Sequence, residues 1–293
     1  MRIFVAVDGS SLSEAVIREV ARRPWPAGSE FAITQALDPY FFTNAPGPME
    51  EAKQAATKSL ERFGKPLVEA GWKVEAKLAL GNPRHMLART ASEWRADLLL
   101  IGSHERRAVS RLLLGSTAQA VLHHAECSVE IIRPGIESGI GEGMRVLLPT
   151  DGSEHAKAAV HTVATRPWPN GSQFKVLASP EYPVFVGEYP YYAPEQIAQL
   201  TQQSLENAKQ AVQSGAEELA KAGLHVASEV MEPMDTPAHS ILAAAEDWKA
   251  DLIVMGSHGR RGFDRLILGS VSESVALHAK CSVELVRMPV AAL

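Results

Sequence analysis

Short apolar runs alternate with helical patterns along the first half of the chain. The runs are bounded by turn residues and have the length of strands, whereas the segments between them repeat their apolar positions about every 3.6 residues. Strands are expected at residues 3–7, 31–36, 73–79, 98–101 and 129–132. Helices are expected to start after Ser11, Met49, Pro83 and Ser116. This β-α-β-α-β-α-β-α-β order is typical of a parallel sheet with crossover helices.

The second half shows the same order of elements because the sequence contains an internal repeat. VDGSSLSEAV is answered by TDGSEHAKAA, RPWPAGSEF by RPWPNGSQF, and WRADLLLIGSHERR by WKADLIVMGSHGRR. Strands are expected at residues 146–149, 174–178, 225–230, 252–255 and 283–286, with helices after Ser153, Pro194, Pro237 and Ser270. We therefore predict two domains, residues 1–134 and 144–293, joined by a Gly-rich linker at 135–143.

Composition narrows the class of protein. The 293 residues are enough for two α/β domains, and no apolar run approaches the roughly 18 residues of a membrane span. The net charge of -5 and the absence of a long basic stretch argue against a nucleic-acid partner or a membrane. The start, MRIFVAVDGS, lacks the features of a signal peptide, so a cytoplasmic location is expected. Cys127 and Cys281 occupy equivalent positions in separate domains, which favours buried thiols over a disulfide.

Candidate chemistry gathers after the first and fourth strands of the second half. Ligands of open parallel sheets bind beyond the carboxyl ends of such strands. Asp151 follows the first strand, and glycines 256, 259 and 269 follow the fourth, where they permit close approach of backbone amides. Ser270 opens a helix whose amino end suits a phosphate, and the hydroxyls of Ser270 and Ser272 would add donors. Gly-rich turns also arise for geometric reasons alone, so these residues leave a phosphate ligand and a purely structural turn both open.

The run GSHGRRGFDRLILGS, residues 256–270, resembles the G-x2-G-x9-G-[ST] pattern of ATP-binding universal stress proteins. The resemblance covers nearly the whole chain, twice. It implies an α/β fold of two tandem Rossmann-like (adenine nucleotide alpha hydrolase-like) domains, each with a five-stranded parallel sheet of order 3-2-1-4-5. It also implies ATP, with Mg²⁺, held in the second domain for a regulatory or protective role in the stress response. The implied ATP-binding residues are Pro149, Thr150, Asp151, Ala178, Met255, Gly256, His258, Gly259, Gly269, Ser270, Val271 and Ser272.

The first half departs from this pattern. Its matching run, GSHERRAVSRLLLGS, has Glu105 where Gly259 stands and Ala108 where Gly262 stands. A carboxylate would repel a triphosphate, and a Cβ would crowd the approach of the backbone. We therefore expect the first domain to have lost ATP binding, although Asp8, Gly115 and Ser116 remain.

Other functions stay open. The protein could be a nucleotide-free interaction scaffold with an unknown protein partner, or a slow ATPase. A hydrolase centred on Ser257 and His258 is disfavoured because adjacent residues rarely aim their side chains at each other. No histidines stand at metal-site spacing, so neither catalytic residues nor metal ligands are assigned.

The terminal strands of the two halves suggest how the domains join. SVEIIR and SVELVR would each leave an apolar sheet edge that invites pairing. Universal stress proteins resemble one another in pairing domains through this fifth strand. We therefore expect strand 128–133 to pair with strand 282–287 as an intramolecular pseudo-dimer, with a homodimer also possible.

Overall fold

The computed structural model describes residues 1–42, 46–103, 114–133, 143–180, 194–232, 236–259 and 268–288, and the statements below concern these residues. In the first half the elements are β1 (Arg2–Val7), α1 (Ser11–Arg22), β2 (Glu30–Leu37), η1 (Pro39–Phe42), α2 (Pro46–Glu69), β3 (Lys73–Leu80), α3 (Pro83–Glu93), β4 (Leu98–Gly102), α4 (Ser116–His124) and β5 (Ser128–Ile132). The short helix η1 was not predicted, and α2 begins before the expected start after Met49.

The second half repeats this order without an equivalent of η1 among its described residues. Its elements are β6 (Arg145–Pro149), α5 (Glu154–Thr165), β7 (Gln173–Ala178), α6 (Pro194–Lys221), β8 (Val226–Val230), α7 (Pro237–Asp247), β9 (Leu252–Gly256), α8 (Ser270–His278) and β10 (Ser282–Val286). All ten expected strands are present, so the predicted α/β alternation is confirmed.

The strands form one ten-stranded mixed sheet of order β3-β2-β1-β4-β5-β10-β9-β6-β7-β8. The prediction of two separate five-stranded sheets is wrong, because β5 and β10 pair antiparallel and make each half's last strand internal. Within each half the strands are parallel and keep the order 3-2-1-4-5. The expected pairing of the two fifth strands is confirmed, with Glu130 directly opposite Glu284. We call this β5–β10 pair and the side chains around it the domain seam.

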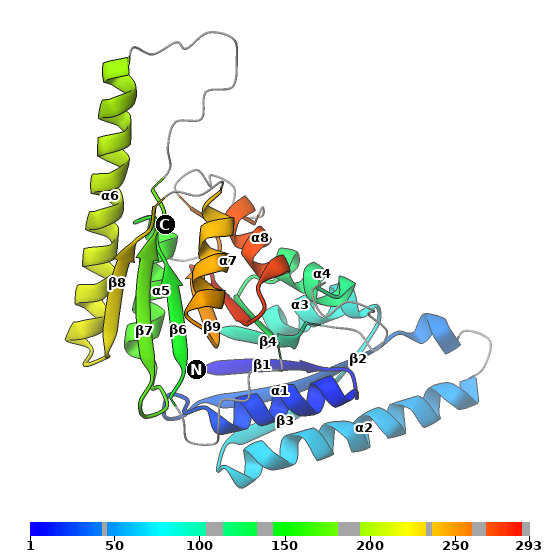
Figure 1. The fold of residues 1–293 in the computed structure, drawn as a ribbon. Helices are drawn as coiled ribbons and strands as arrows, with labels where there is room; N and C mark the ends of the chain where they lie inside the picture. The colour runs from blue at the N-terminus through cyan, green and yellow to red at the C-terminus, as the bar shows by residue number, and fades with distance from the viewer. Residues whose placement is uncertain are drawn as a thin grey trace.

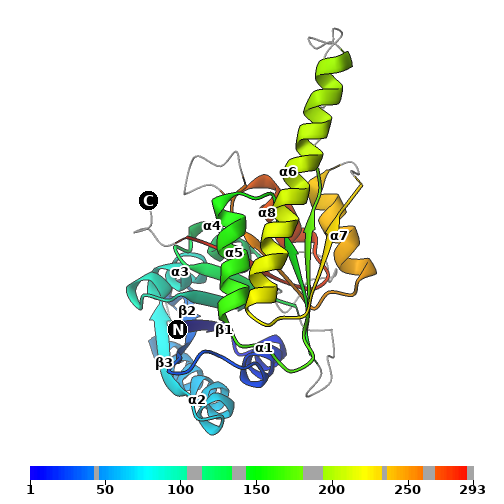
Figure 2. The same cartoon turned by 90° about the vertical axis from the view of Figure 1, so that its left-hand side faces the viewer.

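The two faces of the sheet are packed differently. On one face, α3, α4, α7 and α8 share a single apolar core that continues across both halves. On the other face, α1 with α2 and α5 with α6 cover two separate cores. Figures 1 and 2 show these helices on either side of the sheet, with α6 extending beyond its edge.

An arginine from each half donates hydrogen bonds to a helix of the other half, on the face of the sheet whose apolar core continues across both halves. Arg133, just after β5, donates from its guanidinium to the carbonyl oxygens of Ala276 in α8 and of Cys281. Arg287, just after β10, donates to the carbonyl oxygen of Leu122 in α4 at 2.7 Å. Burial lowers the pKa of Arg133 to about 10. The two helices are therefore capped at their carboxyl ends by the opposite domain.

On the face with two cores, charged residues fill the seam. Glu130 and Glu284 are fully buried, and each pairs with the arginine of an RPWP motif. Arg23 lies 2.8 Å from Glu130, and Arg166 lies 2.7 Å from Glu284. Burial alone would lower the pKa of Arg23, but the carboxylates of Glu130 and Glu19 raise it above its ordinary value. The RPWP repeat thus supplies the counter-charges that a buried carboxylate needs.

Candidate functional site

The candidate site of the second domain lies where β6 and β9 end and α8 begins. Thr150 follows β6, and its amide donates to the carbonyl oxygen of Leu177 at 2.8 Å. Asp151 comes next, and its Oδ1 accepts a hydrogen bond from the amide of Ser153 at 2.9 Å, which starts α5. The turn therefore fixes a carboxylate at the carboxyl end of the sheet.

Glycines after β9 bring other elements close to this carboxylate. A Cβ on Gly259 would lie 2.8 Å from Oδ2 of Asp151, so these two residues, 108 positions apart in the chain, meet at the site. A Cβ on Gly256 would lie 2.6 Å from the backbone carbonyl carbon of His155. Both glycines are needed sterically, which agrees with their selection from the sequence.

The amino end of α8 is open. Its N-cap is Gly269, which makes no side-chain hydrogen bond to the first turn, and Ser270 is exposed. The amide of Gly269 donates to the carbonyl oxygen of Ser257 at 3.0 Å. Ser272, in contrast, is buried and donates from Oγ to the carbonyl oxygen of Gly256 at 2.9 Å. The hydroxyl of Ser272 therefore braces β9, whereas we expected it to be a donor for a ligand.

His155 is a site residue that the sequence analysis missed. Its ring centroid lies 5.0 Å from that of His258, which is buried. Burial lowers the pKa of His155, as does the neighbouring His258, while Asp151 acts in the opposite direction. The available signal was its place in the first turn of the helix after Asp151, because that turn must face the same strand ends.

Ser257 and His258 do aim at each other, contrary to our expectation for adjacent residues. The turn after β9 places Ser257 Oγ 3.0 Å from His258 Nδ1. Ser257 is 2% exposed, however, and its backbone amide and carbonyl bond to Val286 and Gly269. A buried hydroxyl cannot reach a substrate carbonyl, so the pair acts as a structural bridge between β9, β10 and α8.

The remaining expected site residues lie in or near the core. Pro149 and Ala178 end their strands as buried residues, Met255 is buried one residue before the end of β9, and Val271 packs partly buried against the continuous core. The structure therefore brings Asp151, Gly259 and the start of α8 close together at the strand ends. The apolar residues of the expected site lie in the core beneath them. The arginines of residues 260–267 lie outside the described residues.

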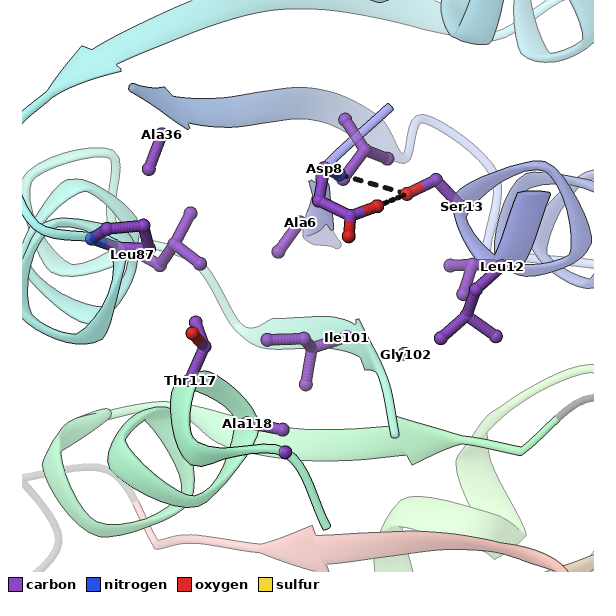
Figure 3. A pocket seen from close by; sticks show the side chains of 14 residues that line it. Ala6, Asp8, Leu12, Ser13, Ala36, Leu87, Ile101, Gly102, Thr117 and Ala118 are labelled. Atoms are coloured by element: carbon purple, nitrogen blue, oxygen red, sulfur yellow. Dashed lines mark hydrogen bonds between the residues drawn. The ribbon is translucent and has the colours of Figure 1, made fainter. Parts of the chain in front are cut away.

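The equivalent place in the first domain is a cavity of about 390 Å³, at the carboxyl ends of β1 and β4 (Figure 3). Asp8 lies at its mouth, where its Oδ1 accepts hydrogen bonds from the amide of Ser10 at 2.9 Å and from Ser13 Oγ at 2.7 Å. Glu105 and Ala108, on which the expected loss of ATP binding rests, lie outside the described residues.

The cysteines and the possible metal ligands were also considered as sources of reactivity. Both cysteines have free thiols, and burial raises the pKa of Cys127 to about 11 and that of Cys281 to about 12. Across the described ranges, no group of three His, Cys, Asp or Glu residues could hold a metal ion. None of the described helices is long and apolar enough to cross a membrane.

The fold is that of an α/β protein built from two repeats, with a cavity at the strand ends of the first half. The universal stress protein family matches the chain twice, over residues 1–133 and 144–287. The chain belongs to this family. A universal stress protein of Mycolicibacterium smegmatis is 27% identical over 97% of this chain and 96% of its own length. One of Methanocaldococcus jannaschii is 33% identical over 54% of this chain and 91% of its own length.

Solved structures of similar fold agree. A universal stress protein from Archaeoglobus fulgidus aligns over 99% of this chain and 97% of its own, with a TM-score of 0.67 and 20% identity. A putative universal stress protein from Pseudomonas aeruginosa aligns over 97% of this chain and 92% of its own, with a TM-score of 0.61 and 14% identity. At these identities the likeness shows the fold alone.

Proposed function

We propose that this universal stress protein binds ATP, with Mg²⁺, in its second domain, and that nucleotide occupancy regulates a stress-response partnership. The observation that carries the proposal is the open amino end of α8 facing Gly259 and Asp151. An uncapped first turn offers backbone amides to an anion, and the helix dipole favours negative charge there. Asp151 would accept hydrogen bonds from a ribose or base, or contribute a carboxylate oxygen toward Mg²⁺.

The residues present fit this group. A Cβ at position 259 would lie 2.8 Å from Oδ2 of Asp151, so the glycine lets the backbone after β9 approach this carboxylate closely. Ser270 stays exposed at the start of the helix. No general base for water is assigned, because His258 is buried and bonded to Ser257. The proposal is therefore a binding function, with the partner unidentified.

Titration of the purified protein with ATP and Mg²⁺ by calorimetry tests the proposal. We expect saturation near one ATP per chain, and nucleotide released on denaturation should be identifiable by absorbance and mass spectrometry. Absence of binding at millimolar ATP would overturn the proposal. Two equivalent sites would overturn the assignment to the second domain alone.

Gly259→Glu localises the site. The new carboxylate would stand beside Asp151 and face the phosphates, and at about 5 Å one such repulsion is worth roughly 3 kcal/mol. We expect ATP affinity to fall at least about 100-fold, while circular dichroism stays that of the wild type. Gly47→Glu is the matched control, because a Cβ on Gly47 meets nothing within 4 Å and the position lies in the other domain. Equal affinities of both variants would mean that the phosphates lie elsewhere.

A further inference from the structure

The first domain contacts α8 of the second domain near both of its ends. At the carboxyl end, Arg133 donates to carbonyl oxygens in and just after the last turn of the helix. In the first turn, Oε1 of Glu273 lies 3.1 Å from Nε2 of His123, which belongs to α4. The helix whose amino end forms part of the candidate site is therefore contacted at that same end by a side chain of the other half.

The contact between His123 and Glu273 runs in one direction, although the sequence contains two repeats. The reciprocal contact would join Gln119 of α4 to Leu277 of α8, and these two side chains cannot form an ion pair. The contacts made by the two seam arginines, in contrast, are present in both directions. The repeat positions therefore place a histidine beside the first turn of α8 and an aliphatic side chain at the reciprocal place.

Glu273 stands in the turn to which the proposed function assigns the phosphates. Its amide donates to the carbonyl oxygen of the N-cap, Gly269, at 2.8 Å, so Glu273 belongs to the first turn. A carboxylate there interacts with the positive end of the helix dipole, which a phosphate would also use, and it repels a second anion. A positive charge on His123 offsets this repulsion. The pair therefore bears on how strongly the amino end of α8 attracts an anion.

We propose that His123 of the first domain tunes the ATP affinity of the second domain by offsetting the charge of Glu273. This inference rests on the proposed function, because it concerns the anion at the amino end of α8. It gives the first domain a regulatory role that requires no ligand of its own. Any partner that draws α4 away from α8 would weaken ATP binding in the other half.

Calorimetric titration with ATP and Mg²⁺ at about pH 6, which favours the charged form of histidine side chains, tests the proposal. The reciprocal positions suggest the substitutions, because Leu277 and Gln119 stand there. His123→Leu should weaken ATP binding about two- to fivefold, the range for one charge in the first turn of a helix. Glu273→Gln should strengthen binding by a similar factor. The double variant should return close to the wild-type affinity, and His123→Lys should retain it.

The opposite signs separate an electrostatic role from a structural one. If the pair only held α8 in place, either single substitution would break the contact and both would weaken ATP binding. His161→Leu is the matched control, because His161 Nδ1 lies 3.0 Å from Oε1 of Glu218 on the other face of the sheet, between α5 and α6. We expect this variant to keep the wild-type affinity. Charges elsewhere around the site are the same in every variant, so the differences report on the pair alone.

Two results would overturn the inference and leave the proposed function standing. These are unchanged ATP affinity in both single variants, and a change of the same sign in both. Absence of ATP binding by the wild-type protein would overturn the inference and the proposed function together. The side chains of His123 and Glu273 are 34% and 35% exposed, and Glu273→Gln preserves the shape of the residue. Because Glu273→Gln alone must strengthen binding, the test stands even if His123→Leu fails to fold.

Discussion

Replacing Arg166 with methionine removes the cation that faces Glu284 inside the domain seam. Glu284 is fully buried, Arg166 is 12% exposed, and their closest N···O distance is 2.7 Å. Breaking a buried pair by removing one partner leaves an uncompensated charge, at a typical cost of about 3–5 kcal/mol. Glu130 lies directly opposite on β5 and offers Glu284 no compensating cation. We therefore expect Arg166→Met to lose about 3–5 kcal/mol of unfolding free energy at neutral pH.

Urea denaturation followed by circular dichroism and by tryptophan fluorescence measures this loss. Adding Glu284→Gln to the Arg166→Met variant removes the buried charge and should recover most of it. Lys280→Met is the matched control, because Lys280 and Glu246 also lie 2.7 Å apart but are 61% and 47% exposed. An exposed pair contributes about 0–1 kcal/mol. The reasoning fails if Arg166→Met costs no more than Lys280→Met, or if the double variant is no more stable than the single one.

Two further predictions concern the glycines at the strand ends and the pH dependence of the seam. Gly256→Ala should lower the free energy of unfolding more than Gly102→Ala does. A Cβ at position 256 would meet the backbone of His155 at 2.6 Å, whereas a Cβ at position 102 would meet the Leu12 side chain, which can move, at 2.8 Å. Equal urea midpoints of the two variants would contradict this prediction. Burial raises the pKa of Glu130 above its ordinary 4.5, with Arg23 opposing and Glu284 adding to the rise, so the folded state keeps this proton longer than the unfolded one. The stability that protonated Glu130 contributes is present below about pH 4.5 and is lost as the pH rises through the folded pKa. Glu130→Gln should therefore flatten the fall of the urea midpoint between pH 4.5 and 8. An unchanged slope would contradict the raised pKa of Glu130.

The pattern of apolar positions was sufficient to place the strands. Each half alternates strand and helix so regularly that every expected strand is present, and pairing of the terminal strands followed from their apolar alternation. The expected pairing already joins the two half-sheets, and what the sequence analysis did not state is that the terminal strands meet antiparallel within one ten-stranded sheet. Local spacing predicted the strands of each half, and the apolar terminal strands predicted the pairing between the halves, which is confirmed.

The candidate site shows the same limit. Glycines 256 and 259 could be selected because steric room is a property of the residue itself. The engagement of Ser272 with Gly256, and the contact of His155 with His258, depend on where helices settle against β9. The cavity of the first domain was not foreseen either, because comparison with a motif shows what a half has lost and not what its remaining side chains enclose.

Arg133 and Arg287 each bond to a helix of the opposite half, so the two halves of the chain depend on each other. Arg133 donates to carbonyl groups near the end of α8, and Arg287 donates to one near the end of α4. Each helix also has a cap from its own half, because the amides of Ala125 and Ala279 donate to Val121 and Val275, so a half expressed alone would lose the arginine contact but keep this bond. In a protein of one such domain, the same arginine contact would require self-association, with the arginine of each subunit reaching its neighbour. Within one chain the two arginine contacts are internal, while the residues at the strand ends of the two halves differ.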